Sequence, residues 1–228
     1  MGVDEAISAL KSGMPVLLYD SESRESEVDM VFHASAVTPE AIYALRARAG
    51  GLICFATRWS IVGYLGVPWG DELIASVPAL RPLTERRLFY GDRPAFTIWV
   101  NHTSVRTGIS DIDRSTTVRE LYEVVKAFLK GDREGARRKF LNEFQAPGHV
   151  PLLASRGLKA RRGHTELSIA LTALAGLEPT TVFAEMLDRG PSLSLEKAKA
   201  IAEREGLALV SGREVIDACD GVEMCWSD

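Results

Sequence analysis

Short apolar runs alternate with amphipathic segments along the whole chain, and this alternation predicts an interleaved series of strands and helices. Apolar residues spaced three and four apart indicate helices, and brief continuous runs indicate buried strands. The predicted strands cover 16–19, 28–34, 52–56, 96–100, 181–184 and 207–211. The predicted helices cover 4–12, 38–49, 117–128, 133–144, 164–175, 194–205 and 213–219. The expected fold is therefore α+β, a layered single domain with a mixed β-sheet flanked by helices.

Capping residues support several of these boundaries. Thr38 followed by Pro39 is typical of a helix start, with threonine as N-cap and proline at the first helical position. Residues 117–120 read Thr-Val-Arg-Glu, which fits a capping box and predicts a helix beginning there. Residues 57–94 contain several Pro, Gly and Trp without a clean period, and no element is assigned to them.

One domain is the simplest organisation for this length. Neither an internal repeat nor a Gly/Ser-rich linker divides the 228 residues. We expect a single domain over 1–219, followed by a loose C-terminal tail over 220–228.

Composition narrows the class of protein. Hydrophobic residues make up 46% and charged residues 25%, with a net charge of −4, so a nucleic-acid-binding surface is not expected. No apolar run is long enough to span a membrane, and the N-terminus has no signal-peptide pattern, so we expect a cytoplasmic protein.

The three cysteines are Cys54, Cys219 and Cys225. Their odd number and the absence of a Cys-x-x-Cys pair argue against a disulfide framework and against a zinc ribbon. Cys54 lies in an apolar run and is most simply a buried thiol.

An acidic segment connects the first two predicted strands. Residues 20–29 read Asp-Ser-Glu-Ser-Arg-Glu-Ser-Glu-Val-Asp, with five carboxylates and the single cation Arg24. The simplest interpretation is a solvated surface turn. The alternative is a site for a hard divalent cation, because clustered carboxylates with little counter-charge suit such an ion. Arg24 could then bind a phosphate or a sugar oxygen as a fork.

A second polar element begins the predicted helix 164–175. Residues 161–166 read Arg-Arg-Gly-His-Thr-Glu. Free N–H groups at a helix start bind phosphate well, glycine permits a close approach, and His164 can ligate a metal. The alternative is that Thr165 or His164 only caps the helix while the arginines lie in solvent. The contiguity of the cations, glycine, histidine and threonine favours the binding site.

These two segments and three others resemble the signatures of one enzyme family. The others are Thr107-Gly108-Ile109-Ser110 with Asp113 to Thr117, Pro147-Gly148-His149-Val150, and Ala175 to Pro179 leading to Glu185. Together, in this order and spacing, the five resemble the 3,4-dihydroxy-2-butanone 4-phosphate synthases, in the monofunctional, archaeal-like form. Two positions depart from the family pattern: Ser26 stands where Asn is frequent, and Arg106 adds a cation where Thr is common.

The resemblance implies a role for each matching residue. Glu25 and His164 would ligate two Mg²⁺ or Mn²⁺ ions, and Glu185, His149 and Asp29 would carry the acid–base chemistry. Arg24, Glu25 and Asp29 would contact the sugar, while Glu27 and Cys54 would line the site beside Glu185. The phosphate end would be held by Arg161, Arg162, Gly163, His164 and Thr165.

The implied reaction converts D-ribulose 5-phosphate to L-3,4-dihydroxy-2-butanone 4-phosphate and formate, a step of riboflavin biosynthesis. It needs metal-assisted enolisation, dehydration, skeletal rearrangement and loss of C4, without a redox cofactor. The resemblance also implies a homodimer in which both subunits contribute to each site. Two alternatives stay open: another metal-dependent phosphosugar isomerase or aldolase, and a non-catalytic sugar-phosphate-binding module.

Overall fold

A seven-stranded sheet organises the chain, in the order β4-β5-β3-β6-β2-β1-β7. The computed structural model describes residues 2–228. Its strands are β1 (Val16–Tyr19), β2 (Val28–His33), β3 (Cys54–Arg58), β4 (Phe96–His102), β5 (Phe144–Ser155), β6 (Thr180–Glu185) and β7 (Ala208–Ser211). The β1–β7 and β3–β5 pairs are parallel and the other neighbours are antiparallel. The predicted mixed sheet in an α+β fold is therefore confirmed.

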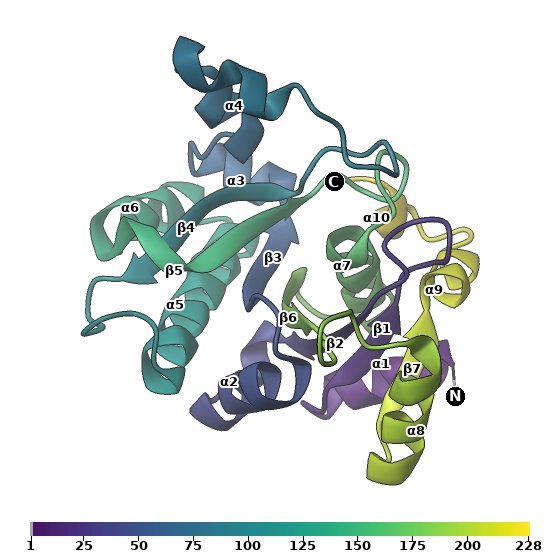
Figure 1. The fold of residues 1–228 in the computed structure, drawn as a ribbon. Helices are drawn as coiled ribbons and strands as arrows, with labels where there is room; N and C mark the ends of the chain where they lie inside the picture. The colour runs from purple at the N-terminus through teal and green to yellow at the C-terminus, as the bar shows by residue number, and fades with distance from the viewer. Residues whose placement is uncertain (1) are drawn as a thin grey trace.

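Helices cover both faces of this sheet (Figure 1). They are α1 (Val3–Lys11), α2 (Pro39–Ala44), α3 (Trp59–Tyr64), α4 (Gly70–Ala75), α5 (Asp111–Leu129), α6 (Arg133–Glu143), α7 (His164–Ala175), α8 (Leu195–Glu205), α9 (Gly212–Ala218) and α10 (Glu223–Trp226). A π-helical turn (Leu45–Ala49) extends α2, and a 3₁₀ segment (Pro78–Thr84) follows α4. None of the helices within residues 2–228 has the length and apolarity needed to cross a bilayer.

Two hydrophobic clusters fix the layers. The first packs α2, α3, α5, α6 and α8 against one face of the sheet, through side chains such as Ile42, Leu121 and Phe140. The second packs α1, α7, α9 and α10 against the other face, through Leu10, Leu171 and Val215. Alternating strand residues supply the two faces, as the period of two requires. Residues of β2, β3 and β6 that face α7 therefore lie together on one side.

Most predicted elements are present, with two corrections. The helix predicted from Thr117 begins at Asp111, where the hydroxyl of Ser110 accepts a hydrogen bond from Asp113 N at 3.1 Å. Thr117 lies inside that helix, and its hydroxyl accepts a hydrogen bond from His102 N instead. Strand β5 was not predicted, because Pro147 and Gly148 disfavour a strand locally; pairing with both β4 and β3 holds it extended.

Residues 57–94, to which no element is assigned from the sequence, contain α3, α4 and the 3₁₀ segment. In Figure 1 α4 stands above β4, and the chain then runs as a long loop toward the acidic segment before it enters β4. Trp59 and Trp69 stack at 4.3 Å between ring centroids. Both also pack in the first hydrophobic cluster, which ties the base of this segment to the domain.

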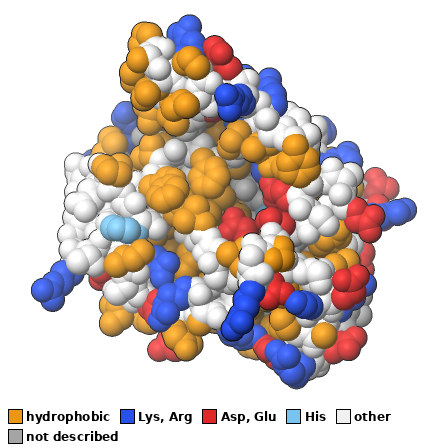
Figure 2. All heavy atoms as spheres, viewed as in Figure 1, with side chains coloured by type: hydrophobic (Ala, Val, Ile, Leu, Met, Phe, Trp, Pro, Cys, Tyr) orange, Lys and Arg blue, Asp and Glu red, His pale blue; other side chains and the backbone are white. Residues whose placement is uncertain are grey.

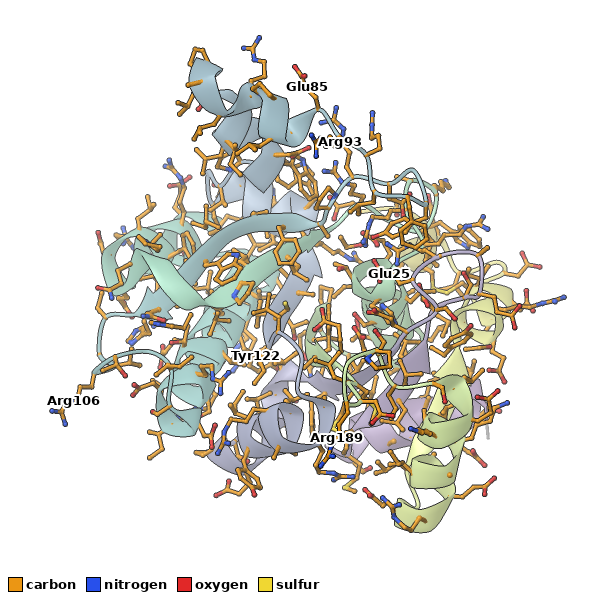
Figure 3. All side chains as sticks on the ribbon, in the orientation of Figure 1. Glu25, Glu85, Arg93, Arg106, Tyr122 and Arg189 are labelled. Atoms are coloured by element: carbon orange, nitrogen blue, oxygen red, sulfur yellow. A yellow bond between two sulfur atoms is a disulfide. The ribbon has the colours of Figure 1, made fainter. Side chains whose placement is uncertain are left out.

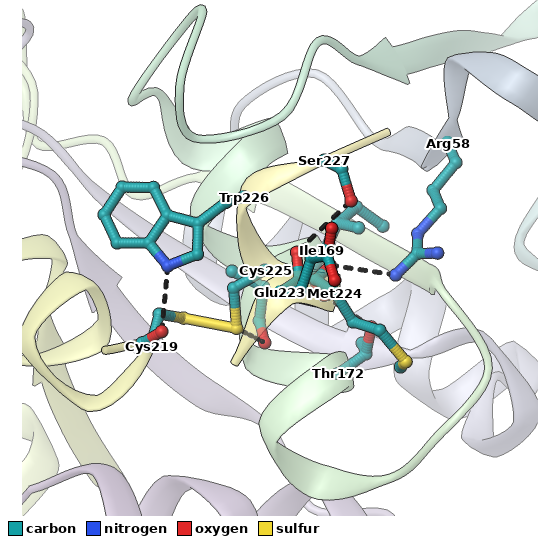
Figure 4. The surroundings of a disulfide bond; sticks show 10 residues. Arg58, Ile169, Thr172, Cys219, Glu223, Met224, Cys225, Trp226 and Ser227 are labelled. Carbon is teal, nitrogen blue, oxygen red and sulfur yellow. Dashed lines mark hydrogen bonds between the residues drawn. A yellow bond between two sulfur atoms is a disulfide. The ribbon is translucent and has the colours of Figure 1, made fainter. Parts of the chain in front are cut away.

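The C-terminal segment and the cysteines differ from expectation. Cys219 and Cys225 form a disulfide with a Cα–Cα distance of 5.9 Å, so the argument from an odd cysteine count was wrong: two cysteines pair and Cys54 stays free and buried. Figure 4 shows the tail around this bond, with Trp226 Nε1 donating to the Cys219 carbonyl at 2.8 Å and Arg58 donating to the Met224 carbonyl. The predicted loose tail is therefore a short helix packed on α7, because burial of Cys225 and these bonds hold it in place.

Candidate active site

The acidic segment is a folded loop organised by its first residue. Asp20 is buried, and its carboxylate accepts hydrogen bonds from the backbone N–H groups of Glu25 and Glu27 at 2.9 and 3.0 Å. The same carboxylate receives Arg24 Nη1 at 3.3 Å. Asp20 thus closes the loop internally, and this leaves Glu25 free to turn toward α7. The surface-turn interpretation fails, since the loop packs inward.

The start of α7 is held by a buried carboxylate. Glu166 accepts hydrogen bonds from Arg161 Nη1 at 2.5 Å, from Gly163 N at 3.2 Å and from Arg156 N at 3.0 Å. Gly163 permits the tight packing here, because a Cβ on it would lie 2.4 Å from Arg161 Nη1 and 2.7 Å from Arg24 Nη2. Arg161 and Arg24 therefore converge at the N-terminus of a 12-residue helix, where free N–H groups favour anions.

His164 joins the two segments in one cluster. Its Nδ1 lies 3.3 Å from Glu25 Oε2 and 3.6 Å from Asp29 Oδ2. Its Nε2 lies 3.2 Å from the carbonyl oxygen of Glu27. A carbonyl oxygen can only accept a hydrogen bond. Nε2 therefore carries a proton. Once a cation displaces the proton on Nδ1, the lone pair of Nδ1 points toward Glu25 and Asp29. A backbone carbonyl that fixes the tautomer in this way is the usual support of a metal-ligating histidine.

Burial and charge shift the pKa values of this cluster in opposite senses. Burial opposes ionisation of Glu25, but hydrogen bonds from His164 and Tyr90 and the charge of Arg24 lower its pKa to about 2. Complete burial raises the pKa of Asp29; His164 opposes this rise, and Glu185, Glu25 and Glu27 add to it. Burial lowers the pKa of His164, but Asp29 and Glu25 outweigh it and raise the pKa above its ordinary value. The cluster therefore retains protons that a bound cation would displace.

Strands of the sheet supply the other side of a small cavity of about 190 Å³. Asp29 on β2 pairs in register with Glu185 on β6, and Cys54 on β3 lies beside them. Glu185 Oε2 accepts a hydrogen bond from Leu52 N at 2.7 Å. Gly51 permits this approach, because a Cβ there would lie 2.2 Å from the same oxygen. Burial raises the pKa of the Cys54 thiol, with Glu185 and Asp29 adding to the rise, so it lines the cavity as a neutral group.

Tyr90 is a site residue that the sequence reasoning missed. Its hydroxyl donates a hydrogen bond to Glu25 Oε1, and its ring lies under the Arg24 guanidinium, 4.3 Å from Cζ to the centroid. Nearby, Asp92 Oδ2 lies 3.1 Å from Arg24 Nε and 3.8 Å from Arg161 Nε. Both residues belong to the segment 57–94, whose lack of periodicity hid them; the only signal was an aromatic and an acid immediately before a predicted strand.

Most of the predicted site residues meet at this cavity. Those that line it are Glu25, Asp29, Cys54, Arg161, His164, Thr165 and Glu185, while Arg24 and Gly163 pack directly behind them. Figure 2 shows acidic side chains gathered in the middle of this face, beside hydrophobic ones, and Figure 3 shows Glu25 above α7.

Four residues that were singled out in the sequence do not line this cavity. Glu27 turns its carboxylate away to accept a hydrogen bond from Ser192 Oγ at 2.5 Å, and Arg162 is exposed on the outer side of its loop. His149 is exposed on β5, where its backbone N donates a hydrogen bond to Asn101 Oδ1. Strand β5 lies two strands away from β6, which carries Glu185, and this separation is roughly 10 Å. Arg106 extends into solvent far from Glu25 (Figure 3), and it does not line the cavity of its own chain.

The residues fit a divalent cation. Oxygen or nitrogen atoms of Asp20, Glu25 and His164 lie within 4.8 Å of one another. Asp29 Oδ1 is buried without a hydrogen-bond partner among the described residues. Hard cations satisfy such carboxylate oxygens, and Glu25 and His164 are the two ligands that the family resemblance implies.

Known proteins of one family are similar to this chain over nearly its whole length. The family model of 3,4-dihydroxy-2-butanone 4-phosphate synthase matches residues 4–218. The chain belongs to this family. A synthase of that name from Methanosarcina mazei is 41% identical over 226 residues, covering 95% of this chain and 90% of the relative. One from Methanothermobacter thermautotrophicus is 39% identical over 224 residues, covering 95% of each.

The fold also matches that of a solved structure of this family. A crystal structure of a 3,4-dihydroxy-2-butanone 4-phosphate synthase in complex with two magnesium ions aligns with a TM-score of 0.78 and 28% identity, over 98% of this chain and 99% of that one. The family identified from the five signatures is thus confirmed. Enzymes of this family are lyases that make 3,4-dihydroxy-2-butanone 4-phosphate from ribulose 5-phosphate in riboflavin biosynthesis.

Proposed function

We propose that this chain converts D-ribulose 5-phosphate to L-3,4-dihydroxy-2-butanone 4-phosphate and formate. The observation that carries the proposal is the convergence of Glu25, Asp29, His164 and Glu185 on one cavity whose edge is formed by Arg161. A five-carbon sugar phosphate divides into a four-carbon phosphate and formate without any oxidant. A site with acids, bases and a cation therefore suffices, and these residues supply it.

Glu25 and His164 would hold two divalent ions, Mg²⁺ or Mn²⁺, at this cavity. The support is the 3.3 Å approach of His164 Nδ1 to Glu25, the fixed tautomer of His164 and the orphaned oxygen of Asp29. When bound, such ions act as Lewis acids that stabilise the negative charge developing on adjacent sugar oxygens. With few protein ligands, their other coordination positions stay available to substrate and water, as Mg²⁺ prefers.

The phosphate end would lie at the start of α7. Arg161, held by Glu166, and the N–H groups of the first turn form an anion site there. Arg24 would fork onto the sugar, since its guanidinium is fixed between Tyr90 and Asp92. The substrate would then extend from this helix toward the sheet, where Asp29 and Glu185 face the carbon skeleton.

Glu185 and Asp29 would transfer the protons. Glu185 is held by Leu52 N through Oε2 alone, so Oε1 is available to take or give a proton. The raised pKa of Asp29 suits a carboxyl that donates a proton to a leaving oxygen. Cys54 would line the site as a neutral thiol. Glu27 would act through its backbone carbonyl on His164 and not by lining the cavity.

A homodimer with shared sites would bring in His149. That residue is exposed on β5 and lies outside the cavity of its own chain. Exposed apolar side chains on α4 and the turn after it, and on β4, suit a protein–protein contact; they are Leu73, Ile74, Val77, Leu80, Leu83 and Trp99.

Mixed dimers test this arrangement directly. His149→Ala and Glu185→Gln are each expected to be inactive alone. If His149 acts across the dimer, mixing and re-forming the two variants restores activity toward about a quarter of the wild-type value, because half of the dimers then hold one intact site. A mixture that stays inactive, with mixed dimers shown by mass spectrometry, would place His149 in its own subunit's site.

Formate release from ribulose 5-phosphate tests the reaction itself. We expect one formate per sugar consumed with Mg²⁺ present, and none after chelation. Substrate loss without formate would indicate an isomerase or aldolase. Tight sugar-phosphate binding without turnover would indicate a binding module.

A further inference from the structure

Two of the sequence signatures lie outside the candidate active-site cavity. They are Thr107 to Ser110 with Asp113 to Thr117, and Pro147 to Val150, and none of these residues lines it. The structure brings both signatures against one residue, Asn101, near the end of β4. Asn101 belongs to neither signature, and it is only 3% exposed. A buried amide at the meeting point of two such segments has contacts that need to be traced.

Each signature contributes a glycine that packs against Asn101. Gly108 has φ 90°, and a Cβ on it would lie 2.2 Å from Asn101 Nδ2 and 2.3 Å from Oδ1. A Cβ on Gly148 would lie 2.3 Å from the backbone N of Asn101. Any larger residue at either position would therefore push Asn101 out of place. The two glycines allow both signatures to close on this one residue.

The loop that carries Gly108 is itself held by a carboxylate. Asp113, in the first turn of α5, accepts hydrogen bonds from the backbone N of Thr107 at 3.2 Å and of Gly108 at 2.9 Å. The carbonyl oxygen of Thr107 in turn lies 3.5 Å from Asn101 Nδ2. The third signature thus holds the side-chain amide of Asn101 in a fixed orientation.

Strand β5 departs from its ladder with β4 beside this amide. Val100 pairs with Val150 and Asn101 pairs with Gln145, so the intervening residues 146–149 have no partner residue on β4. An interruption of this kind turns side chains away from the regular alternation of a strand. His149 is the last residue of this unpaired segment, and its side chain is exposed. Its direction therefore depends on a contact other than the strand ladder.

Asn101 supplies that contact with both atoms of its amide. The backbone N of His149 donates a hydrogen bond to Oδ1 at 2.8 Å, and Nδ2, which can only donate, lies 3.1 Å from His149 Nδ1. Oδ1 also lies 3.3 Å from Nδ1, but Nδ2 is closer and Oδ1 already accepts the backbone N–H. Nδ1 of the neutral ring is therefore an acceptor, and Nε2 carries the proton.

We propose that Asn101 is the positioning residue of His149: it fixes the direction of the ring and the neutral tautomer that presents Nε2–H as a proton donor. The proposal rests on the acid–base role proposed above for His149. Asn101 acts only through that ring, since its own amide is buried. The hydrogen bond made by one ring nitrogen decides which proton the other one offers. A ring held in this form suits a step in which the substrate accepts a proton.

Asn101→Asp tests the tautomer directly, by ¹⁵N NMR of the full-length protein with labelled histidine and Mg²⁺. The carboxylate keeps an acceptor for His149 N but replaces the donor Nδ2 by an acceptor, so the proton of the neutral ring is expected to move from Nε2 to Nδ1. His149→Ala identifies the signal among the four histidines. A wild-type ring protonated on Nδ1, or an unchanged tautomer in Asn101→Asp, overturns the proposal.

Asn101→Ala gives a second reading that introduces no buried charge. It removes both contacts, so the ring of His149 is expected to populate both neutral tautomers. If the carboxylate of Asn101→Asp prevents folding, this variant decides the matter: a single tautomer identical to that of the wild type overturns the proposal.

Kinetics separate this role from a structural one. In Asn101→Asp the kcat of formate release is expected to fall by about 100-fold, while the KM for ribulose 5-phosphate changes by less than about twofold, because proton transfer is affected and binding is not. Asn142→Asp makes the same chemical change on the exposed side of α6 and should leave both constants unaltered.

His149→Ala distinguishes the two ways in which this test can fail. A wild-type kcat in Asn101→Asp, with His149→Ala inactive, overturns the role of Asn101. A wild-type kcat in His149→Ala contradicts the function proposed for His149 itself. In that case, or if the wild type releases no formate, the NMR tautomer alone decides whether Asn101 positions the ring.

Discussion

The two sides of the candidate active-site cavity are built in different ways. The floor consists of Asp29, Cys54 and Glu185, which stand on β2, β3 and β6 and inherit their positions from the strand ladders. The rim consists of the acidic loop, the segment 85–95 and the loop 156–163, whose side chains hold one another through ion pairs and hydrogen bonds.

This difference predicts how each side responds to substitution. A floor residue can lose its chemistry while the sheet keeps its place, because the backbone pairing and the core do not depend on its side chain. A rim residue loses position and stability together, because its partners are charged and partly or wholly buried. Each of the following experiments tests this distinction, beginning with the largest expected effect.

Glu185→Gln should reduce turnover by about 10²–10⁴-fold, the usual contribution of a positioned proton-transfer group. The amide oxygen can still accept the hydrogen bond from Leu52 N, so the free energy of unfolding should change by less than about 0.5 kcal/mol. Formate release and urea unfolding measure the two quantities. Glu196→Gln, an exposed carboxyl on α8, is the matched control. A large loss of stability would show that the floor depends on this side chain after all.

Glu166→Ala should reduce the free energy of unfolding by about 3–5 kcal/mol, because it leaves Arg161 buried without its closest partner. The N–H groups of Gly163 and Arg156 also lose their acceptor. Urea unfolding measures the effect, and Glu203→Ala on the exposed side of α8 serves for comparison. A loss below about 1 kcal/mol would mean that the rim does not rely on buried charge pairs.

Cys219→Ala should reduce the free energy of unfolding by about 2 kcal/mol, since the disulfide closes a short loop. Turnover at a temperature well below the transition should be preserved, because neither cysteine lines the cavity at Glu25 and His164. Thermal unfolding with and without a thiol reductant checks this. Reductant should destabilise the wild type and leave the variant unchanged; equal sensitivity of both would contradict the pairing.

Tyr90→Phe should raise the Mg²⁺ concentration needed for half-maximal activity by about 10–100-fold, the usual cost of losing a group that orients a metal ligand. The phenol oxygen contacts Glu25, and the ring under Arg24 remains in the variant. A magnesium titration of formate release gives the value. Tyr43→Phe changes an exposed tyrosine and should leave the titration unaltered. An unchanged half-maximal Mg²⁺ concentration in Tyr90→Phe would show that the Tyr90 hydroxyl does not orient Glu25.

Ser26→Asn should raise the free energy of unfolding by about 0.5 kcal/mol, the smallest effect expected here. Ser26 has φ 55°, within the left-handed region that Asn adopts more readily than Ser. Denaturant unfolding at high precision can resolve it, with Ser23→Asn in the same loop as control. A destabilisation would show that the contact between Ser26 Oγ and Tyr19 outweighs the backbone preference.

The sequence predicted most elements because their signals are local. β1 and α7 have the predicted bounds, and the helix starting after Ser194 ends at Gly206 as its caps indicate. Strand β5 was missed because its extended backbone is imposed by two neighbours and not by its own residues. The helix that begins at Asp111 was predicted to begin only at Thr117, because Thr117 and the residues after it resemble a capping box. In the structure the Thr117 hydroxyl instead accepts a hydrogen bond from His102 N.

The candidate site was predicted where its residues are contiguous. Arg24 with Glu25, and Arg161 to Thr165, stand in compact motifs whose chemistry is visible in one dimension. Tyr90 and Asp92 were missed because they lie 66 and 68 positions after Arg24, which they contact. No local sequence pattern indicates these contacts.

The sequence by itself determined the alternation of strands and helices, the two polar motifs and, through the five signatures together, the family. Only the tertiary structure decided that Asp20 organises the acidic loop, that Tyr90 and Asp92 join it, and that the tail is held by the disulfide between Cys219 and Cys225. The physical reason is that propensity, capping and charge density act between near neighbours in the chain. Burial, pairing register and the partner of each charge depend on segments that meet only when the chain folds.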